Sequence, residues 1–149
     1  MTTKIHALVD HRMRPVVLRL TPGQAGDNPQ LVPLLTDWTQ QGSLGGRRCR
    51  VRLLADKAYS HASTRRELRR RRMPHTIPER SDQREYRASR GSKGGRPPSF
   101  DPACYAQRNT IERGFARLKQ WRGIASRYDK YALVFLGGIL LAATLQYRQ

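Results

Sequence analysis

The longest uncharged segment of the chain lies near its C-terminus and contains the run from Tyr131 to Gln146, which reads YALVFLGGILLAATLQ. A helix that spans a membrane needs roughly 18 to 20 apolar residues, and this run is shorter. We therefore predict a buried C-terminal helix on which the rest of the chain places its apolar faces. The adjacent Gly137 and Gly138 would let a neighbouring element approach this helix closely, because glycine has no Cβ.

The remainder of the chain is strongly basic. Its 29 Lys and Arg against 11 Asp and Glu give a formal net charge of +18 on 149 residues. The positive electrostatic potential of such a chain attracts polyanions and opposes self-association, so nucleic acid is the expected partner. Because 38% of the residues are apolar and several segments are well patterned, we expect one globular domain rather than a disordered chain.

Cysteine and histidine usage gives no sign of a metal site. Cys49 and Cys104 are far apart and lack paired zinc-ligand spacing, so free thiols in a reducing compartment are the simplest interpretation. No basic-then-apolar leader opens the chain, which argues against secretion. Ligand spacing is also absent among the histidines, His6, His11, His61 and His75.

Strand and helix signals alternate along the chain. The runs Lys4–Asp10 and Pro15–Leu20 predict a hairpin, with Ile5, Ala7 and Val9 on one face. After a loop rich in Gly and Pro, Asp27 or Asn28 can cap a helix whose first turn holds Pro29. Further elements are expected at Leu31, Leu34, Leu35 and Trp38 (helix), Val51, Leu53 and Leu54 (strand), ASTRRELRRRR (helix), HTIP (possible strand) and Asp101 to about Gly123 (helix). This order predicts an α/β fold with helices packed on a central sheet.

The segment from Arg65 to Arg96 has twelve Arg or Lys and four Asp or Glu. Its second half, ERSDQREYRASRGSKGGRPPS, has no apolar periodicity, so we predict a loop or insertion at about residues 80–100. Composition alone allows a solvated linker. It also allows an electrostatic track for a phosphate backbone, in which Tyr86 would add little base stacking.

Glu112 lies among cationic side chains in the helix expected after Asp101. At about 100° per residue, it shares one stripe with Tyr105, Arg108 and Lys119. The apolar face beside this stripe holds Ile111, Phe115 and Leu118. A surface ion pair between Arg108 and Glu112 is the simpler interpretation from helical geometry alone.

Asp56 favours a functional role for Glu112 over a surface ion pair. It follows the predicted strand VRLL, and ligands of open α/β sheets gather beyond the carboxyl ends of strands. A lone aspartate there is commonly just a polar residue at a strand end. Paired with Glu112 on a helix beside the sheet, however, it could hold divalent cations such as Mg²⁺ for phosphoryl transfer.

The residues Tyr105, Arg108, Glu112 and Lys119 are separated by two, three and six residues. In these types and spacings the chain resembles the Y-R-E-K signature of Asp-Asp-Glu (DDE) transposases of bacterial insertion sequences. Other stretches resemble the same family in the same order, and together they cover most of the chain: TKIHALVD, LTPGQAGD, LADKAYS, RGSKGGRPPSFD and RNTIERGFARLKQWRGIASRYDK.

The resemblance implies a ribonuclease-H-like mixed sheet flanked by helices, two Mg²⁺ or Mn²⁺ ions, and cleavage and joining of DNA strands at transposon ends. By motif position, Asp56 and Glu112 correspond to the second catalytic aspartate and the catalytic glutamate, and both would bind metal. Tyr105, Arg108 and Lys119 would position DNA and the glutamate. The implied partner is double-stranded DNA, at transposon ends and target, in the bacterial cytoplasm near the nucleoid. The cations expected to contact DNA are Arg84, Arg87, Arg90, Lys93, Arg96, Arg113 and Arg117.

In this family the first catalytic aspartate lies on a strand upstream of the TKIH hairpin, whereas Asp10 belongs to what looks like a turn. We therefore expect residues 1–149 to form a partial catalytic domain without that first strand, inactive alone and completed by an upstream transposase segment or a homo-oligomer. A non-catalytic protein that binds DNA or RNA, or an inert transposase remnant, remains an alternative. Only a transposase active site requires both Asp56 and Glu112, so their loss separates these possibilities.

Overall fold

The computed structural model describes residues 2–41, 51–129 and 131–147. The chain divides into two compact units. The first unit comprises Met1–Ser43 and Asn109–Gln149, and the second comprises Leu44–Arg108. The described residues are of mixed α/β class, as predicted. Their strands pair as one two-stranded sheet in each unit, and not as the central sheet that we expected.

The predicted hairpin is confirmed in the first unit. Strands β1 (Thr3–Val9) and β2 (Pro15–Pro22) pair antiparallel. Their turn is held by the Asp10 carboxylate, which accepts the backbone N–H groups of Arg12 and Arg14, each at 2.9 Å. Asp10 is therefore a turn residue, and its side chain stabilises the connection between the strands.

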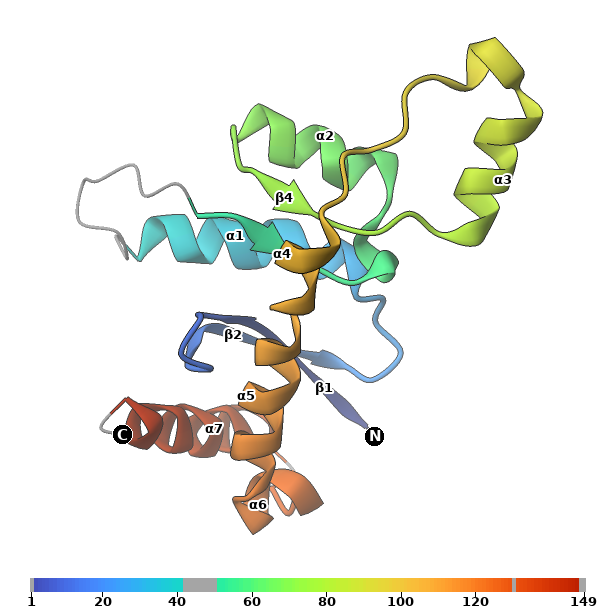
Figure 1. The fold of residues 1–149 in the computed structure, drawn as a ribbon. Coiled ribbons are helices and arrows are strands. Elements are labelled where there is room, and N and C mark those ends of the chain that lie inside the picture. The colour runs from blue at the N-terminus through green and yellow to red at the C-terminus, as the bar shows by residue number, and fades with distance from the viewer. Residues whose placement is uncertain (1, 42–50, 130, 148–149) are drawn as a thin grey trace. The chain divides into compact units, whose positions relative to one another are not determined.

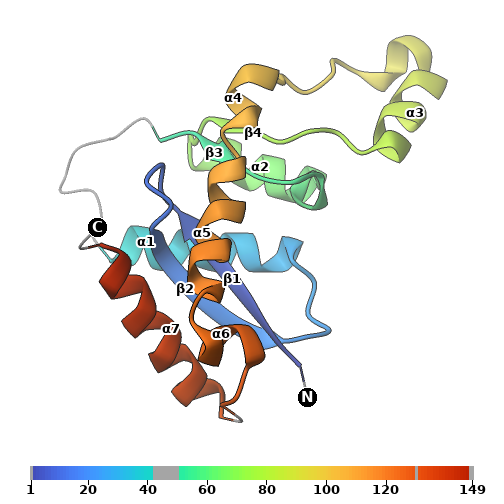
Figure 2. The same ribbon diagram turned by 60° about the horizontal axis from the view of Figure 1, so that its bottom comes forward.

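Helices cover both faces of this hairpin (Figure 2). One face carries Ile5, Leu18 and Leu20, which pack against the apolar core. From the opposite face, the Arg19 guanidinium pairs with Asp37 of α1 (Leu31–Gln40) at 2.5 Å. The hairpin thus lies between α1 and the C-terminal helices. The helical spacing in α1 predicted its buried residues Leu31, Leu34 and Leu35, while Trp38 is half-buried.

The turn before α1 is a short 3-10 helix, η1 (Asn28–Gln30), with Asp27 at its N-cap position. The Asp27 side chain makes no capping hydrogen bond, contrary to our expectation for this residue. Its carboxylate instead lies 3.2 Å from the Lys4 ammonium group on β1. A charged partner has taken the place of the helix N–H groups.

The core of the first unit forms where α5 (Asn109–Lys119), α6 (Arg122–Ser126) and α7 (Ala132–Gln146) meet the hairpin. Gly114 allows α5 to approach closely, because a Cβ there would lie only 3.0 Å from the Met13 carbonyl oxygen. The buried members of this core are Leu118, Ile124, Phe135, Ile139, Ala142 and Ala143.

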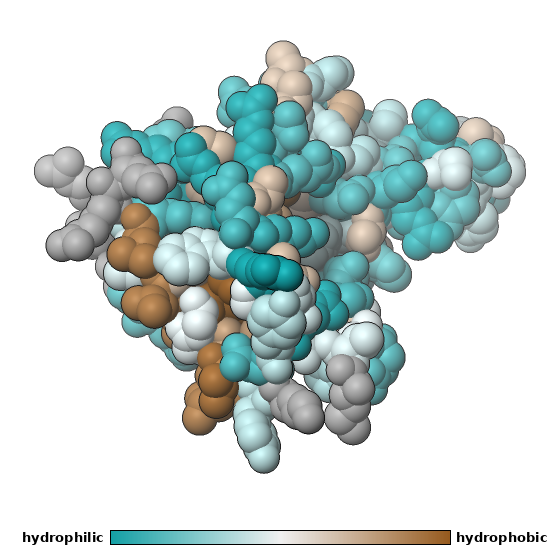
Figure 3. All heavy atoms as spheres, turned by 90° about the horizontal axis from the view of Figure 1, so that it is seen from below, coloured by the Kyte–Doolittle hydropathy of each residue, from teal (hydrophilic) through white to brown (hydrophobic). Residues whose placement is uncertain are grey.

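Only one side of α7 is buried, so the prediction of a buried C-terminal helix is half right. Phe135 is 2% exposed, whereas Leu133 on the other side is 82% exposed. Apart from the adjacent residues and backbone of α7 itself, no described atom lies within 4 Å of a Cβ built at Gly137 or Gly138, so the close approach that we expected there is not made. Apolar side chains gather on this end of the first unit (Figure 3). None of the helices in the described ranges has the length and apolarity needed to cross a membrane.

In the second unit, β3 (Leu53–Leu54) pairs parallel with β4 (His75–Thr76), which confirms both predicted strands in shorter form. The crossover contains η2 (Lys57–Tyr59) and α2 (Ala62–Arg70), which lies beside β4 in Figure 1. Leu68 and Ile77 are fully buried. Arg65 is also buried, and its guanidinium donates to the Ile77 carbonyl at 2.9 Å.

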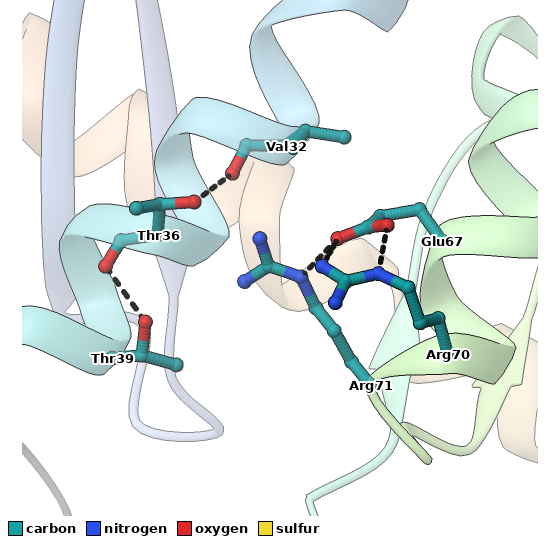
Figure 4. A network of polar contacts seen from close by, with 6 residues as sticks. All are labelled: Val32, Thr36, Thr39, Glu67, Arg70 and Arg71. Carbon is teal, nitrogen blue, oxygen red and sulfur yellow. Dashed lines mark hydrogen bonds and ion pairs between the residues drawn. The ribbon is translucent and has the colours of Figure 1, made fainter.

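Part of the positive charge of α2 is neutralised locally (Figure 4). Glu67 accepts from Arg70 and Arg71, each at 2.7 Å, and these two guanidiniums lower the pKa of Glu67 to about 2. Figure 4 also draws two hydroxyl bonds within α1 of the first unit, from Thr36 to the Val32 carbonyl and from Thr39 to the Thr36 carbonyl.

The basic segment that we predicted as a loop contains a helix, α3 (Ser81–Ser89), followed by η3 (Gly91–Gly94). No residue of α3 is buried, so no apolar periodicity reveals it. Its Gln, Arg, Glu and Ala residues are good helix formers. At its start Gln83 accepts the Arg80 backbone N–H at 3.4 Å, and Arg87 pairs with Glu79 at 2.6 Å.

The single helix predicted from Asp101 to Gly123 is broken. Asp101 caps α4 (Pro102–Ala106) as expected, accepting the Cys104 N–H at 3.0 Å, but α4 ends there and α5 begins at Asn109. The next two N–H groups, of Gln107 and Arg108, bond to carbonyls three residues back, which tightens and ends the turn. The residues that follow, Asn109, Thr110 and Ile111, have low helix propensity.

Candidate functional site

Asp56 lies two residues beyond β3, at the carboxyl end of a parallel strand, as the sequence predicted. It is the N-cap of η2, and its Oδ1 accepts the Lys57 backbone N–H at 2.5 Å. The carboxylate is half-buried and lines a cavity of about 430 Å³. The local fold thus holds this carboxylate at the edge of a space large enough for a hydrated ion or a phosphate.

Two cations that sequence reasoning missed share this cavity with Asp56. Lys57 follows Asp56 directly, so its adjacency in the sequence could have identified it. Arg80 is brought there by the start of α3, for which no sequence pattern gave a signal. Arg80 pairs with Asp82 at 2.9 Å, and Asp82 also lines the cavity.

Glu112 lies in the first turn of α5 and is exposed. A carboxylate is favoured there by the positive end of the helix dipole. Lys119 follows seven residues later on the same side of α5, about 10 Å along the axis, and is exposed as well. The predicted alignment of these two residues therefore holds.

The four signature residues do not belong to one helix, because the break between α4 and α5 comes between Tyr105 and Glu112. Tyr105 and Arg108 belong to the second unit, and Glu112 and Lys119 belong to the first. The Arg108 guanidinium lies 5.8 Å from the centre of the Tyr105 ring, which also packs against Phe100 at 5.3 Å between ring centres. The structure thus brings the first two signature residues together, and helical phase does not relate them to the other two.

Most of the predicted DNA-contacting cations are exposed. Arg87 differs, because it is half-buried and paired with Glu79, so it stabilises the start of α3. Arg117 is half-buried on α5. The exposed members are Arg84, Arg90, Lys93, Arg96 and Arg113.

Among the residues that the structure describes, no group of three or more His, Cys, Asp or Glu side chains could hold a metal ion. His6 is buried and lies 2.7 Å from the Thr21 hydroxyl, and His75 Nδ1 lies 3.2 Å from the Met73 carbonyl. Cys104 is a free thiol, and Cys49 lies outside the described residues. The metal-binding candidates are the predicted carboxylates, one in each unit.

Comparison with known proteins gives the same family as the resemblance. Residues 1–146 match the family model of the transposase DDE domain. The putative transposase for insertion sequence element IS6501 of Brucella ovis (strain ATCC 25840 / 63/290 / NCTC 10512) is 31% identical over 145 residues, which cover 97% of each chain. No solved structure matches the chain. The family match spans almost the whole sequence, so the chain belongs to the DDE transposases of bacterial insertion sequences.

Proposed function

We propose that this chain takes part in DNA transposition by metal-dependent cleavage and transfer of DNA strands, with Asp56 and Glu112 as catalytic, metal-binding carboxylates. The observation that carries the proposal is the position of Asp56 at the end of β3, lining a cavity together with two cations. Glu112 supports it as an exposed carboxylate in the stretch that resembles the family's signature. A ribonuclease-H-like arrangement of the complete domain is part of the same proposal.

The donor groups suit hard divalent ions such as Mg²⁺ or Mn²⁺, which prefer carboxylate oxygens. Asp56 uses one oxygen for the Lys57 N–H, and its carboxylate borders about 430 Å³ of space. When bound, a pair of such ions would stabilise the attacking and leaving oxygens of the transferred phosphoryl group. In that reaction Lys57 and Arg80 are placed to neutralise a phosphate next to Asp56.

The exposed cations would hold the DNA backbone. Lys119 lies two helical turns from Glu112, so we assign it to a DNA phosphate rather than to metal. Tyr105 and Arg108 stack on each other and would together position the DNA and Glu112. The backbone contacts are assigned to the exposed Arg84, Arg90, Lys93, Arg96 and Arg113, with Arg87 and Arg117 less accessible.

The two assigned carboxylates are fewer than the three of the family's active site. We therefore propose that a further carboxylate comes from an upstream transposase segment or from a second copy, and that residues 1–149 alone bind DNA without cutting it. A displacement of about 1 Å can greatly reduce the rate of such a transfer, so two ligands would not fix the metals well enough.

Strand nicking tests the catalytic assignment. We would assay nicking of transposon-end duplexes in Mg²⁺ with the chain alone and with the upstream coding segment added, fused or in trans. In the active combination, Asp56→Asn and Glu112→Gln should abolish nicking and leave DNA binding nearly intact. Asp101→Asn is the control, because asparagine also caps a helix and the charge change is the same. Nicking that survives both carboxylate changes would refute the assignment.

A non-catalytic basic binding protein is the second candidate, favoured by α3, which buries no residue, and by the exposed cations Arg84, Arg90 and Lys93 on and after this helix. Both candidates predict salt-sensitive binding to duplex DNA. Neutralising six phosphates gives a slope of roughly −5 in log K against log salt. Deleting residues 81–99 should lower that slope if α3 and η3 follow the backbone, and an unchanged slope would make the segment a linker.

A further inference from the structure

The second unit contains a cavity of about 370 Å³ whose lining is cationic. Arg65 and Arg69 come from α2 and His75 from β4, while Arg96 and Ser99 lie on the segment that leads to α4. Figure 1 shows this segment passing beside α2 and β4. The only other lining residues are two prolines, so no carboxylate lines the cavity.

Three arginines around one space are unfavourable unless an anion joins them, because like charges at short range repel. Other arginines of the second unit have acidic partners, such as Arg80 with Asp82 and Arg87 with Glu79. The side chains of Arg69 and Arg96 make no hydrogen bond or ion pair with any described residue. Their charges are therefore available to a ligand.

Arg65 supplies a fixed charge at the inner wall. It is 7% exposed, and its guanidinium is held by the Ile77 carbonyl at 2.9 Å. Burial lowers the pKa of this guanidinium; the Glu79 charge opposes that shift, and the Arg69 charge adds to it. An arginine nevertheless stays protonated in proteins, so this positive charge persists without a carboxylate in contact.

The part of the cavity wall formed by residues 96–99 is stiff. Arg96 and Ser99 flank Pro97 and Pro98, and each proline ring fixes its own φ near −65°. The segment therefore presents a guanidinium and a hydroxyl to the cavity with little backbone freedom to lose on binding. It belongs to the RGSKGGRPPSFD stretch, to which the proposed active site assigns no role beyond backbone contact by exposed cations.

We propose that this cavity binds a phosphate group of the DNA backbone, with Arg69 and Arg96 donating to its oxygens and Arg65 as a fixed charge behind them. Guanidinium forks match phosphate geometry and give charge-assisted hydrogen bonds. The choice of DNA as the source of the phosphate rests on the proposed function, and free inorganic phosphate offers the same chemistry.

The test uses the full chain with Arg69→Ala, Arg96→Ala and the double variant. Arg66→Ala is the matched control, because Arg66 is an exposed neighbour on α2 that does not line the cavity. Binding to a fluorescent duplex is measured at fixed salt, and binding of inorganic phosphate is measured by calorimetry. Each cavity variant should weaken DNA binding about tenfold, the effect of losing one charge-assisted contact. Arg66→Ala should stay within about threefold.

One further measurement and one further variant keep the result interpretable. Circular dichroism reports whether each variant is folded, and Arg96→Lys, which keeps the charge but loses the fork, should bind DNA between wild type and Arg96→Ala. If Arg66→Ala and Arg69→Ala weaken binding equally, or if the double variant binds both ligands like wild type, the site is wrong. A wild-type chain that binds neither ligand would also overturn it.

The remaining outcomes separate this site from the proposed function. Phosphate binding that needs Arg69 and Arg96, in a chain that does not bind DNA, would keep the site and refute the proposed function. If DNA binding needs both arginines but inorganic phosphate does not bind measurably, the cavity recognises only the phosphodiester of the DNA backbone. Nicking that depends on Asp56 and Glu112, with DNA affinity unchanged in the double variant, would keep the function and refute this site.

Discussion

The two units stabilise their interiors by different means. The first unit buries a cluster of aliphatic and aromatic side chains between its hairpin and three helices. The second buries two large aliphatic side chains, Leu68 and Ile77, together with the polar Thr64, Arg65 and Thr76. In the second unit, hydrogen bonds donated by the buried Arg65 add to the stability that this small apolar core provides. Part of the positive charge of the second unit therefore also has a structural role.

The two units also differ in a helix that leaves a large face exposed. In the first unit α7 is apolar on all sides but buries one, which leaves Leu133, Val134 and Leu141 more than half exposed. In the second unit α3 buries no residue, and its longest side chains are charged or, like Tyr86, exposed. The exposed apolar patch on α7 is of the kind that marks an interaction surface or an aggregation liability. A charged helix without a packed face depends on local pairs and propensity instead.

The largest expected effect is in the core of the first unit. Phe135→Ala should lower the free energy of unfolding by about 3 to 5 kcal/mol, because the ring is fully packed and its removal leaves a cavity. Leu133→Ala on the same helix is the control and should change it by less than about 0.5 kcal/mol. Urea unfolding measures both. Equal effects would mean that the buried side of α7 has been wrongly identified.

A smaller loss is expected at the buried arginine of the second unit. Arg65→Ala removes the donor to the Ile77 carbonyl and should cost about 1 to 3 kcal/mol, the penalty for an unsatisfied buried group. Hydrogen exchange at β4 and Ile77 reports this unit separately. Arg66→Ala should leave that exchange unchanged. Protection equal to wild type in Arg65→Ala would contradict a structural role for Arg65.

The pH response should separate the units further. Burial lowers the pKa of His6 below 6.5, an effect that Asp27 opposes and Lys4 reinforces, so the unfolded chain takes up a proton more readily. Stability of the first unit is thus complete above pH 6.5 and should fall below it, by at most about 1.4 kcal/mol per pH unit. Glu67, with a pKa of about 2 against 4.5, contributes above pH 4.5 and loses its contribution as pH falls toward 2.

Exchange of β1 and α2 amides at pH 7, 6 and 5 checks this difference. His6→Gln can keep a hydrogen bond to Thr21 without titrating, and it should flatten the response of the first unit between pH 7 and 5. The same slope in wild type and His6→Gln would exclude His6 as the cause.

The smallest effect is expected on α3. Tyr86 is 65% exposed, and the Arg90 guanidinium lies 5.7 Å from the centre of its ring. Tyr86→Ala should therefore change the free energy of unfolding by less than about 0.5 kcal/mol. Thermal unfolding of the full chain measures it. A loss above 1 kcal/mol would show that α3 packs more tightly than its exposure indicates.

Sequence patterns predicted elements whose side chains alternate between core and solvent. The hairpin and α1 followed from periods of two and 3.6 residues, because each packs on a neighbour. The helix α3 has no such period, since it buries no residue, and its formation rests on propensity and on pairs such as Glu79 with Arg87. The break between α4 and α5 was missed because a periodic stripe carries no information about where hydrogen bonding stops.

The sequence by itself determined the family, through motifs that run in order along almost the whole chain, and it identified Asp56 and Glu112 as the carboxylates to test. It also predicted the hairpin and the positions of β3 and β4, but not the pairing of β3 with β4. Only the tertiary structure decided which side of α7 is buried, since an all-apolar helix has no preferred face. Only folding brought Arg80 to the cavity of Asp56 and Lys57, and Arg96 to the cavity of Arg65 and Arg69. Arg80 and Arg96 are far along the chain from the residues that they join, and their positions depend on how α2, α3 and the proline segment pack, which no local pattern records.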